Sequence, residues 1–325
     1  MQSLAFEEVF AILTGLPLQT EQVARLRAWI ASLVAPGECL ALIAAAAGTP
    51  PCPHCAGARV HRCGRASGLQ RWRCLACRRS YNALTGTALA RLRKKEAWLP
   101  YLRCVLDSDT VRRAADHVGV HRTTSFRWRH RFVPGAARER PARLSAIVEA
   151  DETYRLESQK GSRALDRPAR RRGGVASRRG IGREHDCLLV ARDRSGQTLD
   201  FHAGRGPVTA ARLDTCLGPV LAPDVLLVSD AAAAYRTFAT RAAITHAFVN
   251  LKAGVRVRGA IHIQNVNAWH SRFKTWLVRF RGVASRYLIH YSGWQRLLDD
   301  RLLTAPAQLL RAIVEFGKRR SALSN

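Results

Sequence analysis

Acidic residues are scarce in this sequence. Its 325 residues include 24 Asp and Glu against 53 Lys and Arg, which gives a formal net charge of +29 and a pI near 11.3. Such an excess of positive charge repels itself in a compact protein unless a polyanion neutralises it. We therefore expect a nucleic acid as the partner. Arginine far outnumbers lysine, which suits bidentate contacts to phosphate but is also common in proteins of GC-rich genomes.

Long apolar runs are also missing. A helix needs roughly 18 or more apolar residues to cross a membrane, and the longest candidate, Cys39 to Ala47, is too short. The segment Met1 to Phe10 carries acidic residues and no basic stretch, which argues against a signal peptide. We expect a cytoplasmic protein with no membrane partner.

Nine cysteines in a chain of this kind indicate thiols and metal ligands rather than a disulfide framework. Four of them form two C-x2-C pairs, Cys52 with Cys55 and Cys74 with Cys77. The spacing between the pairs is that of a four-thiolate structural zinc site. A redox C-x2-C pair is the weaker alternative, because redox chemistry does not need two matched pairs.

The residues around these pairs alternate as short strands do, and they predict a zinc ribbon with strands at 58–65, 69–73 and 78–83. A core this small depends on Zn²⁺ to fold. The remaining cysteines lack such spacing and are expected to be ordinary core or surface thiols: Cys39, Cys63, Cys104, Cys187 and Cys216.

Residues 89–133 have the pattern of a helix-turn-helix. One helix is predicted over 110–118, a turn at 119–120 and a basic second helix over 121–131, followed by a linker over 134–141. In such a unit the second helix enters the major groove and its N-terminal residues contact base edges. The candidate DNA contacts are Arg122, Thr123, Thr124 and Arg127. A plain helical hairpin is the alternative interpretation.

A carboxylate interrupts a strand-like stretch at Val148 to Leu156. The flanking residues favour strands, whereas Asp is depleted there. Asp151 thus breaks a local rule inside a good element, which marks a functional candidate; an Asp on a solvated strand face is the alternative. A second acid, Asp230, ends the apolar run that begins at Val225, as in a buried strand that delivers a carboxylate to a sheet edge.

From residue 142 onward the predicted order is strand, strand, strand, helix, strand, helix, strand, helix. This order resembles the ribonuclease H-like fold, in which the first and fourth strands lie side by side, so Asp151 and Asp230 would converge. In two-metal phosphoryl transfer, carboxylates hold two Mg²⁺ ions about 3.5–4 Å apart. A third oxygen ligand is expected on the long helix predicted over 266–280.

A basic insert at 158–184 separates the first two of these strands. It reads as a mobile loop suited to a phosphate backbone, with a disordered solubilising insert as the alternative. Its candidate DNA contacts are Arg170, Arg171, Arg172, Arg178 and Arg179.

Several motifs together resemble the bacterial insertion-sequence transposases of the zinc-ribbon family fifteen-ninety-five: the two C-x2-C pairs, Asp151 to Tyr154, Ser229 to Tyr235, and His262 to Lys274. That family carries a third acid, Glu, on the last helix and a Lys seven positions later. The matching positions here are Asn267 and Lys274, and some family members are similar in carrying Asn. The resemblance implies a triad of Asp151, Asp230 and Asn267 that holds Mg²⁺ or Mn²⁺, with Lys274 on a phosphate. Asn265 is the rival third ligand, with a helix N-cap as its other possible role.

The resemblance implies a DNA transposase that binds terminal inverted repeats through the ribbon and the helix-turn-helix, then cuts the ends and joins them to target DNA. A homo-oligomer in a synaptic complex and a location at the bacterial nucleoid are expected. The alternatives are a catalytically inactive or domesticated DNA-binding protein and a nuclease of the same fold. The expected fold is a multidomain α/β (α+β) chain, divided into a helical segment at 1–48, a ribbon at 49–88, a helix-turn-helix at 89–133, a catalytic domain with a mixed sheet flanked by helices at 142–300, and a C-terminal helix at 301–325.

Overall fold

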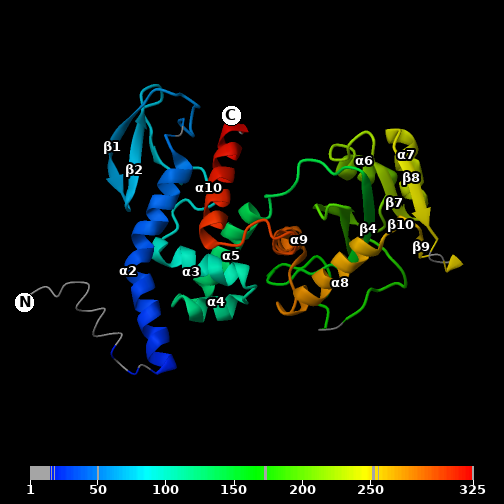
Figure 1. Cartoon of the computed structure of the whole chain (residues 1–325), viewed down its shortest axis with the longest axis horizontal. Coiled ribbons are helices and arrows are strands. Elements are labelled where there is room, and N and C mark those ends of the chain that lie inside the picture. The colour runs from blue at the N-terminus through cyan, green and yellow to red at the C-terminus, as the bar shows by residue number, and fades with distance from the viewer. Residues whose placement is uncertain are drawn as a thin grey trace, which may run out of the picture.

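A computed structural model of the chain describes residues 15, 17, 19–49, 51–171, 174–250, 253–254 and 256–323. These residues form a helical region that carries a small sheet and, beside it, a region built on a five-stranded sheet (Figure 1). Within the described ranges no helix has the length and apolar character needed to cross a membrane. Residues 1–14, where the predicted N-terminal helical segment begins, lie outside the described residues.

The small sheet follows a long first helix, α2 (Thr20–Ala47). The side chain of Gln22 accepts a hydrogen bond of 2.9 Å from the N–H of Gln19, which fixes the helix start. Three antiparallel strands then lie in the order β1-β2-β3: β1 (Val60–Ala66), β2 (Leu69–Cys74) and β3 (Ser80–Asn82). The predicted strands of this segment are confirmed with slightly different ends. Their core is small and centres on Trp72 stacked against Tyr81.

The predicted helix pair and its turn are confirmed in the next segment. Thr110 caps the first of these helices by accepting from the N–H of Arg113, and His121 caps the second by accepting from the N–H of Thr123. Gly119 makes the turn between them with a φ of +62°. The elements are η1 (Lys95–Ala97), α3 (Trp98–Leu106), α4 (Val111–His117) and α5 (Arg122–Ala136).

The linker predicted from residue 134 onward is wrong at its start, because α5 continues through Pro134 to Ala136. Tertiary packing outweighs the cost of the proline here. The last turn of the helix is buried, and Gly135 approaches α10 so closely that a Cβ atom would lie 3.0 Å from Ile313. Only the residues that follow connect this helix to the large sheet.

The large sheet has the strand order β6-β5-β4-β7-β8. β4 pairs with β5 in antiparallel and with β7 in parallel orientation, and β8 is parallel to β7. The predicted adjacency of the first and fourth strands of this region is therefore confirmed. The elements are β4 (Ile147–Leu156), β5 (His185–Asp193), β6 (Thr198–Arg205), α6 (Ala210–Leu217), β7 (Leu226–Asp230), α7 (Ala233–Ala242) and β8 (Thr245–Val249).

The two faces of the large sheet are covered by different helices. Val148 and Ala150 of β4 pack with α6 and α7, whereas Leu188 and Val190 of β5 share a core with α8 (Gln264–Val278) and α9 (Ser285–Asp299). A short hairpin, β9 (Val257–Arg258) with β10 (Ile261–His262), leads into α8 and was not predicted. Because side chains alternate along a strand, Glu149 and Asp151 face the side of α8.

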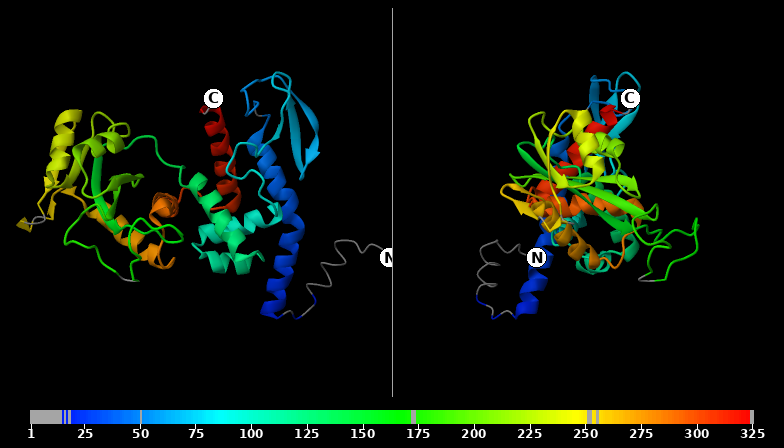
Figure 2. Two further views of the ribbon diagram at one scale, coloured as in Figure 1. Left: turned by 180° about the vertical axis from the view of Figure 1, so that it is seen from behind. Right: turned by 90° about the vertical axis from the view of Figure 1, so that its right-hand side faces the viewer.

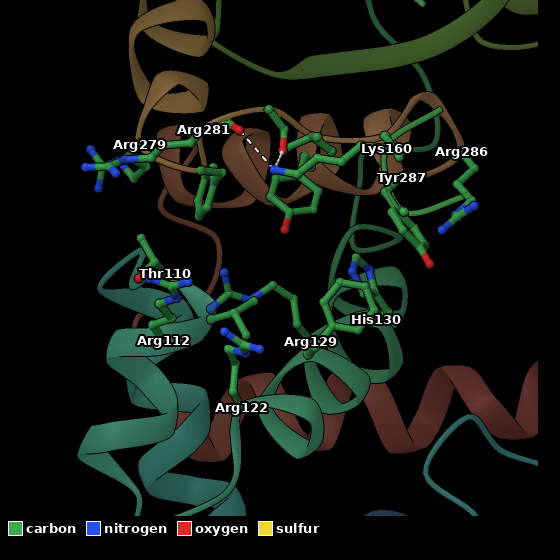
Figure 3. Close-up of a pocket in the computed structure, with 18 residues that line it drawn as sticks. Thr110, Arg112, Arg122, Arg129, His130, Lys160, Arg279, Arg281, Arg286 and Tyr287 are labelled. Atoms are coloured by element: carbon green, nitrogen blue, oxygen red, sulfur yellow. Dashed lines mark hydrogen bonds between the residues drawn. The ribbon is translucent and has the colours of Figure 1, made fainter. Parts of the chain in front are cut away.

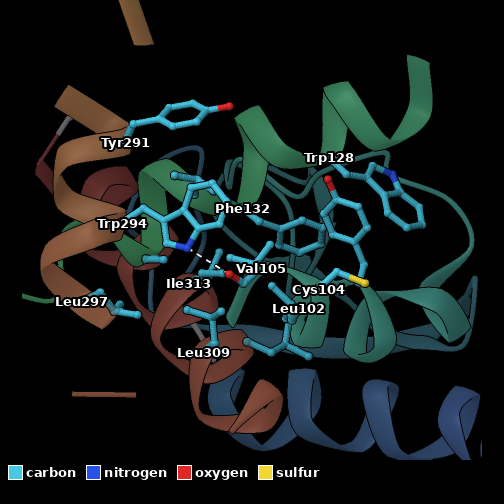
Figure 4. Packing of buried hydrophobic residues seen from close by; sticks show 14 of the residues in the cluster. Leu102, Cys104, Val105, Trp128, Phe132, Tyr291, Trp294, Leu297, Leu309 and Ile313 are labelled. Atoms are coloured by element: carbon cyan, nitrogen blue, oxygen red, sulfur yellow. Dashed lines mark hydrogen bonds between the residues drawn. The ribbon is translucent and has the colours of Figure 1, made fainter. Parts of the chain in front are cut away.

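The C-terminal helix returns to the beginning of the chain. α10 (Pro306–Leu323) packs against α2, α3 and α5 (Figures 1 and 2). α9 lies between the two regions and contacts both α5 and β6. Its Trp294 is fully buried and donates a hydrogen bond of 3.0 Å to the carbonyl oxygen of Val105 (Figure 4). One hydrophobic core therefore runs from the helix-turn-helix into the large sheet.

Candidate active site and metal centre

The two C-x2-C pairs converge on one point. The Sγ atoms of Cys52 and Cys77 lie 3.5 Å apart, those of Cys55 and Cys74 lie 3.6 Å apart, and all four lie within 4.8 Å of one another. Four sulfurs at about 2.3 Å from one tetrahedral zinc ion would be separated by about 3.8 Å. The cluster can therefore hold a metal ion, and its donor atoms fit zinc.

The backbone turns sharply at the cluster, and the pKa shifts of the thiols differ: burial raises the pKa of Cys52, whereas that of Cys74 is lowered. A residue in the left-handed conformation follows each pair, Ala56 with φ +57° and Arg78 with φ +56°, and turns the chain sharply at the cluster. Hydrogen bonding from the backbone of Cys77 lowers the pKa of Cys74 to about 7. This favours the thiolate, which is the form that binds metal.

The isolated cysteines behave as expected where they are buried: burial raises the pKa of Cys39 and of Cys187 to about 12, which makes them unreactive core thiols. Cys104 is also buried, but it has polar neighbours. Its Sγ lies 3.8 Å from Nδ1 of His117, which in turn lies 3.1 Å from a carboxylate oxygen of Asp109. Asp109 is also paired with Arg113 at 3.0 Å, so its charge is already met.

The two predicted acids meet on adjacent parallel strands. Glu149 of β4 is aligned with Val228 of β7, and two further residues along each strand bring Asp151 opposite Asp230. Asp230 accepts a hydrogen bond of 3.0 Å from the N–H of Ala232. Burial, then the charges of Glu152 and Asp230, raise the pKa of Asp151 to about 7. This concentration of buried negative charge favours a bound cation.

Glu152 brings a third carboxylate near the site from the other face of β4. It accepts hydrogen bonds from the hydroxyl of Tyr235 at 2.7 Å and from the hydroxyl of Tyr154 at 3.2 Å. Burial is the main cause that raises its pKa. Glu152 and Tyr235 were not predicted as site residues, although they lie inside the motifs Asp151 to Tyr154 and Ser229 to Tyr235.

A fully buried carboxylate, Glu149, anchors α8 on β4. It accepts from the backbone N–H groups of Asn265 at 2.8 Å and Val266 at 3.0 Å, and Arg194 lies 2.7 Å from its second oxygen. The side-chain amide of Asn265 donates to the same carboxylate at 2.8 Å. Asn265 is thus the second residue of α8 and is held by Glu149. Its predicted alternative role as the helix N-cap is wrong, because Ile263 occupies that position.

Three polar residues on one face of α8 follow this anchor, because positions three and four apart lie on the same side of a helix. They are Asn267, His270 and Lys274. His270 is buried, and its Nδ1 lies 3.7 Å from Oδ2 of Asp151. The positive charge of Lys274 partly offsets the rise in the pKa of Asp151, so this face of α8 is turned toward the two acids. Asn267 is exposed at the same face.

His270 was not predicted as a site residue, because it lies within the apolar stripe of α8, beside Trp269 and Phe273. Burial, assisted by the charge of Lys274, lowers its pKa to about 3, so its imidazole is neutral at neutral pH. Its Nε2 has no hydrogen-bond partner within the part of the chain that the structure describes.

The predicted DNA contacts on α5 lie at its free N-terminal end. Arg122, Thr123 and Arg127 are exposed, and Thr124 is half-buried. None of these four forms an ion pair with another described residue. They lie in the first two turns of α5.

The basic insert is more ordered at its ends than a free loop. Arg170 lies 2.7 Å from a carboxylate oxygen of Glu184 and donates to the carbonyl oxygen of Glu157 at 2.7 Å. Arg167 pairs with the buried carboxylate of Glu157 at 2.9 Å. Arg170 is therefore an internal ion-pair partner, contrary to its predicted role as a free DNA contact. Arg171, Arg178 and Arg179 are exposed, and Arg172 lies outside the described residues.

Comparison with known proteins gives a consistent picture for this region. Residues 143–294 match the family model of the ISXO2-like transposase domain. An uncharacterized protein in transposable element ISH50 of Halobacterium salinarum is 27% identical over 267 residues, which cover 81% of this chain and 90% of that protein.

Two solved structures show weaker likeness. A pre-cleavage Mos1 transpososome is 14% identical over 69% of this chain and 77% of that chain, with a TM-score of 0.25. A Mos1 strand transfer complex is 18% identical over 62% of this chain and 75% of that chain, with a TM-score of 0.19.

Proposed function

We propose that this chain is the DNA transposase of an insertion sequence and that its chemistry takes place at Asp151, Asp230 and Asn267. The match of residues 143–294 to the family model of the ISXO2-like transposase domain supports this proposal. The observation that carries this assignment is the meeting of Asp151 and Asp230 on adjacent parallel strands, with α8 held against them by Glu149. The strand order resembles that of a ribonuclease H-like catalytic domain, which supports the proposal.

The residues fit divalent metal ions of the hard class. Two carboxylates and one amide oxygen are donors that Mg²⁺ and Mn²⁺ prefer. When bound, such ions activate the attacking oxygen and stabilise the leaving oxygen of phosphoryl transfer. Asn267 supplies a neutral oxygen in place of the Glu that the resemblance implies for other members of the family, so this set holds one negative charge fewer than a set with Glu.

The other side chains of the site prepare these ligands. Asp151 ionises fully only above its raised pKa of about 7 unless a cation is present. His270 stays neutral beside Asp151. It therefore restricts where the carboxylate can lie but does not form an ion pair with it. Lys274 lies at the edge of the site, where its ammonium can contact a phosphate of the DNA strand.

DNA recognition is assigned to the other region of the chain. We assign Zn²⁺ to Cys52, Cys55, Cys74 and Cys77, where it stabilises the ribbon, and end binding to the ribbon together with the exposed start of α5. Arg171, Arg178 and Arg179 of the insert are exposed cations near the catalytic sheet and are candidates for phosphate contacts. Arg172 keeps the role predicted from the sequence. Two DNA ends must be paired for transposition, so a homo-oligomeric complex at the nucleoid is part of this proposal.

A DNA-joining assay tests the assignment. The full-length protein is incubated with Mg²⁺ or Mn²⁺, labelled DNA that carries the element's own ends, and a plasmid target. We expect joined products, and a loss of at least about 10²–10³-fold in Asp151→Asn and in Asp230→Asn, the scale on which an enzyme loses a group that stabilises charge in the transition state.

The matched control is Asp224→Asn, which removes the same charge from an exposed position outside the site. Joining by Asp151→Asn at the unaltered rate would refute the assignment. Cutting without joining would instead identify a nuclease of the same fold. DNA binding with no metal-dependent chemistry would identify a DNA-binding protein that has lost catalysis.

A further inference from the structure

A basic cavity of about 910 Å³ lies between the helix-turn-helix and the turn that joins α8 to α9. Seven basic side chains line it, and among the described residues no carboxylate does. Figure 3 shows Arg112, Arg122 and Arg129 on the helix-turn-helix side, opposite Lys160 and Arg281. Seven like charges around one cavity repel one another, so the cavity favours an anionic ligand.

Arg129 strengthens this argument, because it is fully buried and incompletely paired. Its Nη2 donates to the carbonyl oxygen of Asp109 at 2.6 Å. Nε and Nη1 make no well-formed hydrogen bond within the described part of the chain, although Tyr101 and Tyr291 lie close enough to interact with the guanidinium. The guanidinium lies over the rings of Trp294 and Phe280, 5.1 and 5.7 Å from their centroids, but it has no carboxylate partner among the described residues, and a buried charge without one is costly. A phosphate in the cavity would complete its hydrogen bonds.

An aromatic group stands beside these charges. Phe126 is 42% exposed and packs edge-on against His130, with ring centroids 4.4 Å apart. His130 is stacked on Tyr287 of α9 at 3.7 Å. Burial, then the charge of Arg129, lowers the pKa of His130 to about 4, so it is neutral at neutral pH and serves as an aromatic support. The half-exposed ring of Phe126 is a surface on which a planar group can stack.

We propose that this cavity binds a nucleotide of single-stranded DNA, with its phosphate against Arg112, Arg122 and Arg129 and its base against Phe126. Phosphate-binding cations interleaved with aromatic rings are the means by which proteins hold unpaired strands. The volume is that of a site for a small molecule and is too small for a duplex.

The arrangement of α5 supports the same assignment. Arg122, Phe126 and Arg129 follow one another at helical spacing and face the cavity. Thr123 and Arg127 are exposed on another side of the helix. One helix can thus present one face to duplex DNA and another to an unpaired strand next to it. The proposal rests on the proposed function in taking DNA as the ligand, but it requires no catalysis.

Fluorescence anisotropy with the full-length protein tests it, using a labelled thymidine oligonucleotide and a duplex of equal length, with no added divalent ion. Phe126→Leu keeps an apolar side chain and removes the ring, whereas Phe126→Tyr keeps the ring. We expect Phe126→Leu to weaken binding of the single strand by about 5- to 150-fold, the range for loss of one stacked base. Binding of the duplex should change less than about two-fold, and Phe126→Tyr should bind both as the unaltered protein does.

The charges are tested by Arg112→Ala with Arg311→Ala as the matched control, since Arg311 is an exposed arginine on α10 away from the cavity. Arg112→Ala should weaken single-strand binding and reduce its salt dependence by about one phosphate contact. The control should do neither. Equal losses for single strand and duplex in Phe126→Leu, or no loss for either, would overturn the proposal.

The outcome is separable from that of the joining assay. If Asp151→Asn joins ends at the unaltered rate while single-strand binding still depends on Phe126, the catalytic assignment falls and the cavity assignment stands. If the unaltered protein joins ends and Phe126→Leu binds both DNAs normally, the catalytic assignment stands and the cavity assignment falls.

Discussion

The two metal sites proposed for this chain have opposite character. The four thiols around Cys52 form a closed set in a segment with a small core, whereas Asp151 and Asp230 form an open set of oxygen donors on a large buried sheet. A closed thiolate set is suited to hold structure, and an open oxygen set leaves positions for a substrate. We infer that the ribbon depends on its metal for stability. The large sheet folds without metal and is destabilised by repulsion among its own carboxylates.

The largest expected difference between the two sites is in folding. Cys74→Ser removes one of four ligands, and the ribbon then loses most of the stabilisation that zinc supplies, about 10–16 kcal/mol in zinc-finger peptides. We expect residues 60–82 to lose their protection from hydrogen exchange while β4 and β5 keep theirs. Zinc content and exchange mass spectrometry measure this. Cys63→Ser, outside the cluster, is the control and should retain zinc. A protected ribbon in metal-free Cys74→Ser protein would contradict the account.

The next largest effect concerns the anchor of α8. Glu149→Ala leaves Arg194 and two backbone N–H groups at the start of α8 without their acceptor. Loss of one partner from a buried pair costs about 3–5 kcal/mol. We therefore expect a lower free energy of unfolding in urea and slower DNA joining. Glu315→Ala removes an exposed carboxylate and should change neither quantity. A fully stable Glu149→Ala protein would show that the anchor is dispensable.

The charge strain in the catalytic sheet should appear as a dependence of stability on pH. The pKa of Asp151 rises from 3.8 to about 7 on folding, so the folded protein binds the proton more tightly than the unfolded chain. Without divalent metal, stability should therefore fall as the pH rises from about 4 to 7 and level off above that. Asp151→Asn should remove about 2–4 kcal/mol of this fall. Parallel unfolding curves for the two proteins across this pH range would refute the claim of strain. Adding Mg²⁺ above pH 7 should stabilise the unaltered protein more than the variant.

The smallest effect tests the support behind the acids. Tyr235→Phe removes one of the two hydroxyls that donate to Glu152, and the second, from Tyr154, remains. We expect a loss of about 1 kcal/mol in the free energy of unfolding. Tyr81→Phe, in the ribbon, is a comparison outside the catalytic sheet. An unchanged stability of Tyr235→Phe would mean that water replaces the lost donor.

Local patterns in the sequence predicted much of this molecule. The cysteine pairs, the helix-turn-helix and the strands of both sheets follow from spacing over a few residues, and the family match confirms the resemblance drawn from the motifs. Asp151 and Asp230 could be paired because strand order brings distant residues together. Their roles, and that of Asn267, stay predictions until joining is measured.

What the sequence did not reveal depends on packing between distant segments. His270 and Glu149 stand among apolar residues in the sequence. The contact of His270 with Asp151 and that of Glu149 with Asn265 form only once α8 lies on β4. Arg170 could not be distinguished from its exposed neighbours, because its pairing with Glu184 arises from the path of the insert. The continuation of α5 through Pro134 depends on α10, which lies far along the chain.

DNA joining by variants at Asn267 tests whether this Asn completes the proposed catalytic site. The unaltered protein, Asn267→Ala and Asn267→Glu are compared on the same labelled ends and plasmid target with Mg²⁺ or Mn²⁺. We predict that the unaltered protein and Asn267→Glu join the ends and that Asn267→Ala does not. Joining only after Glu is introduced would contradict the account and identify this chain as an inactive DNA-binding relative, and joining by Asn267→Ala would remove Asn267 from the site.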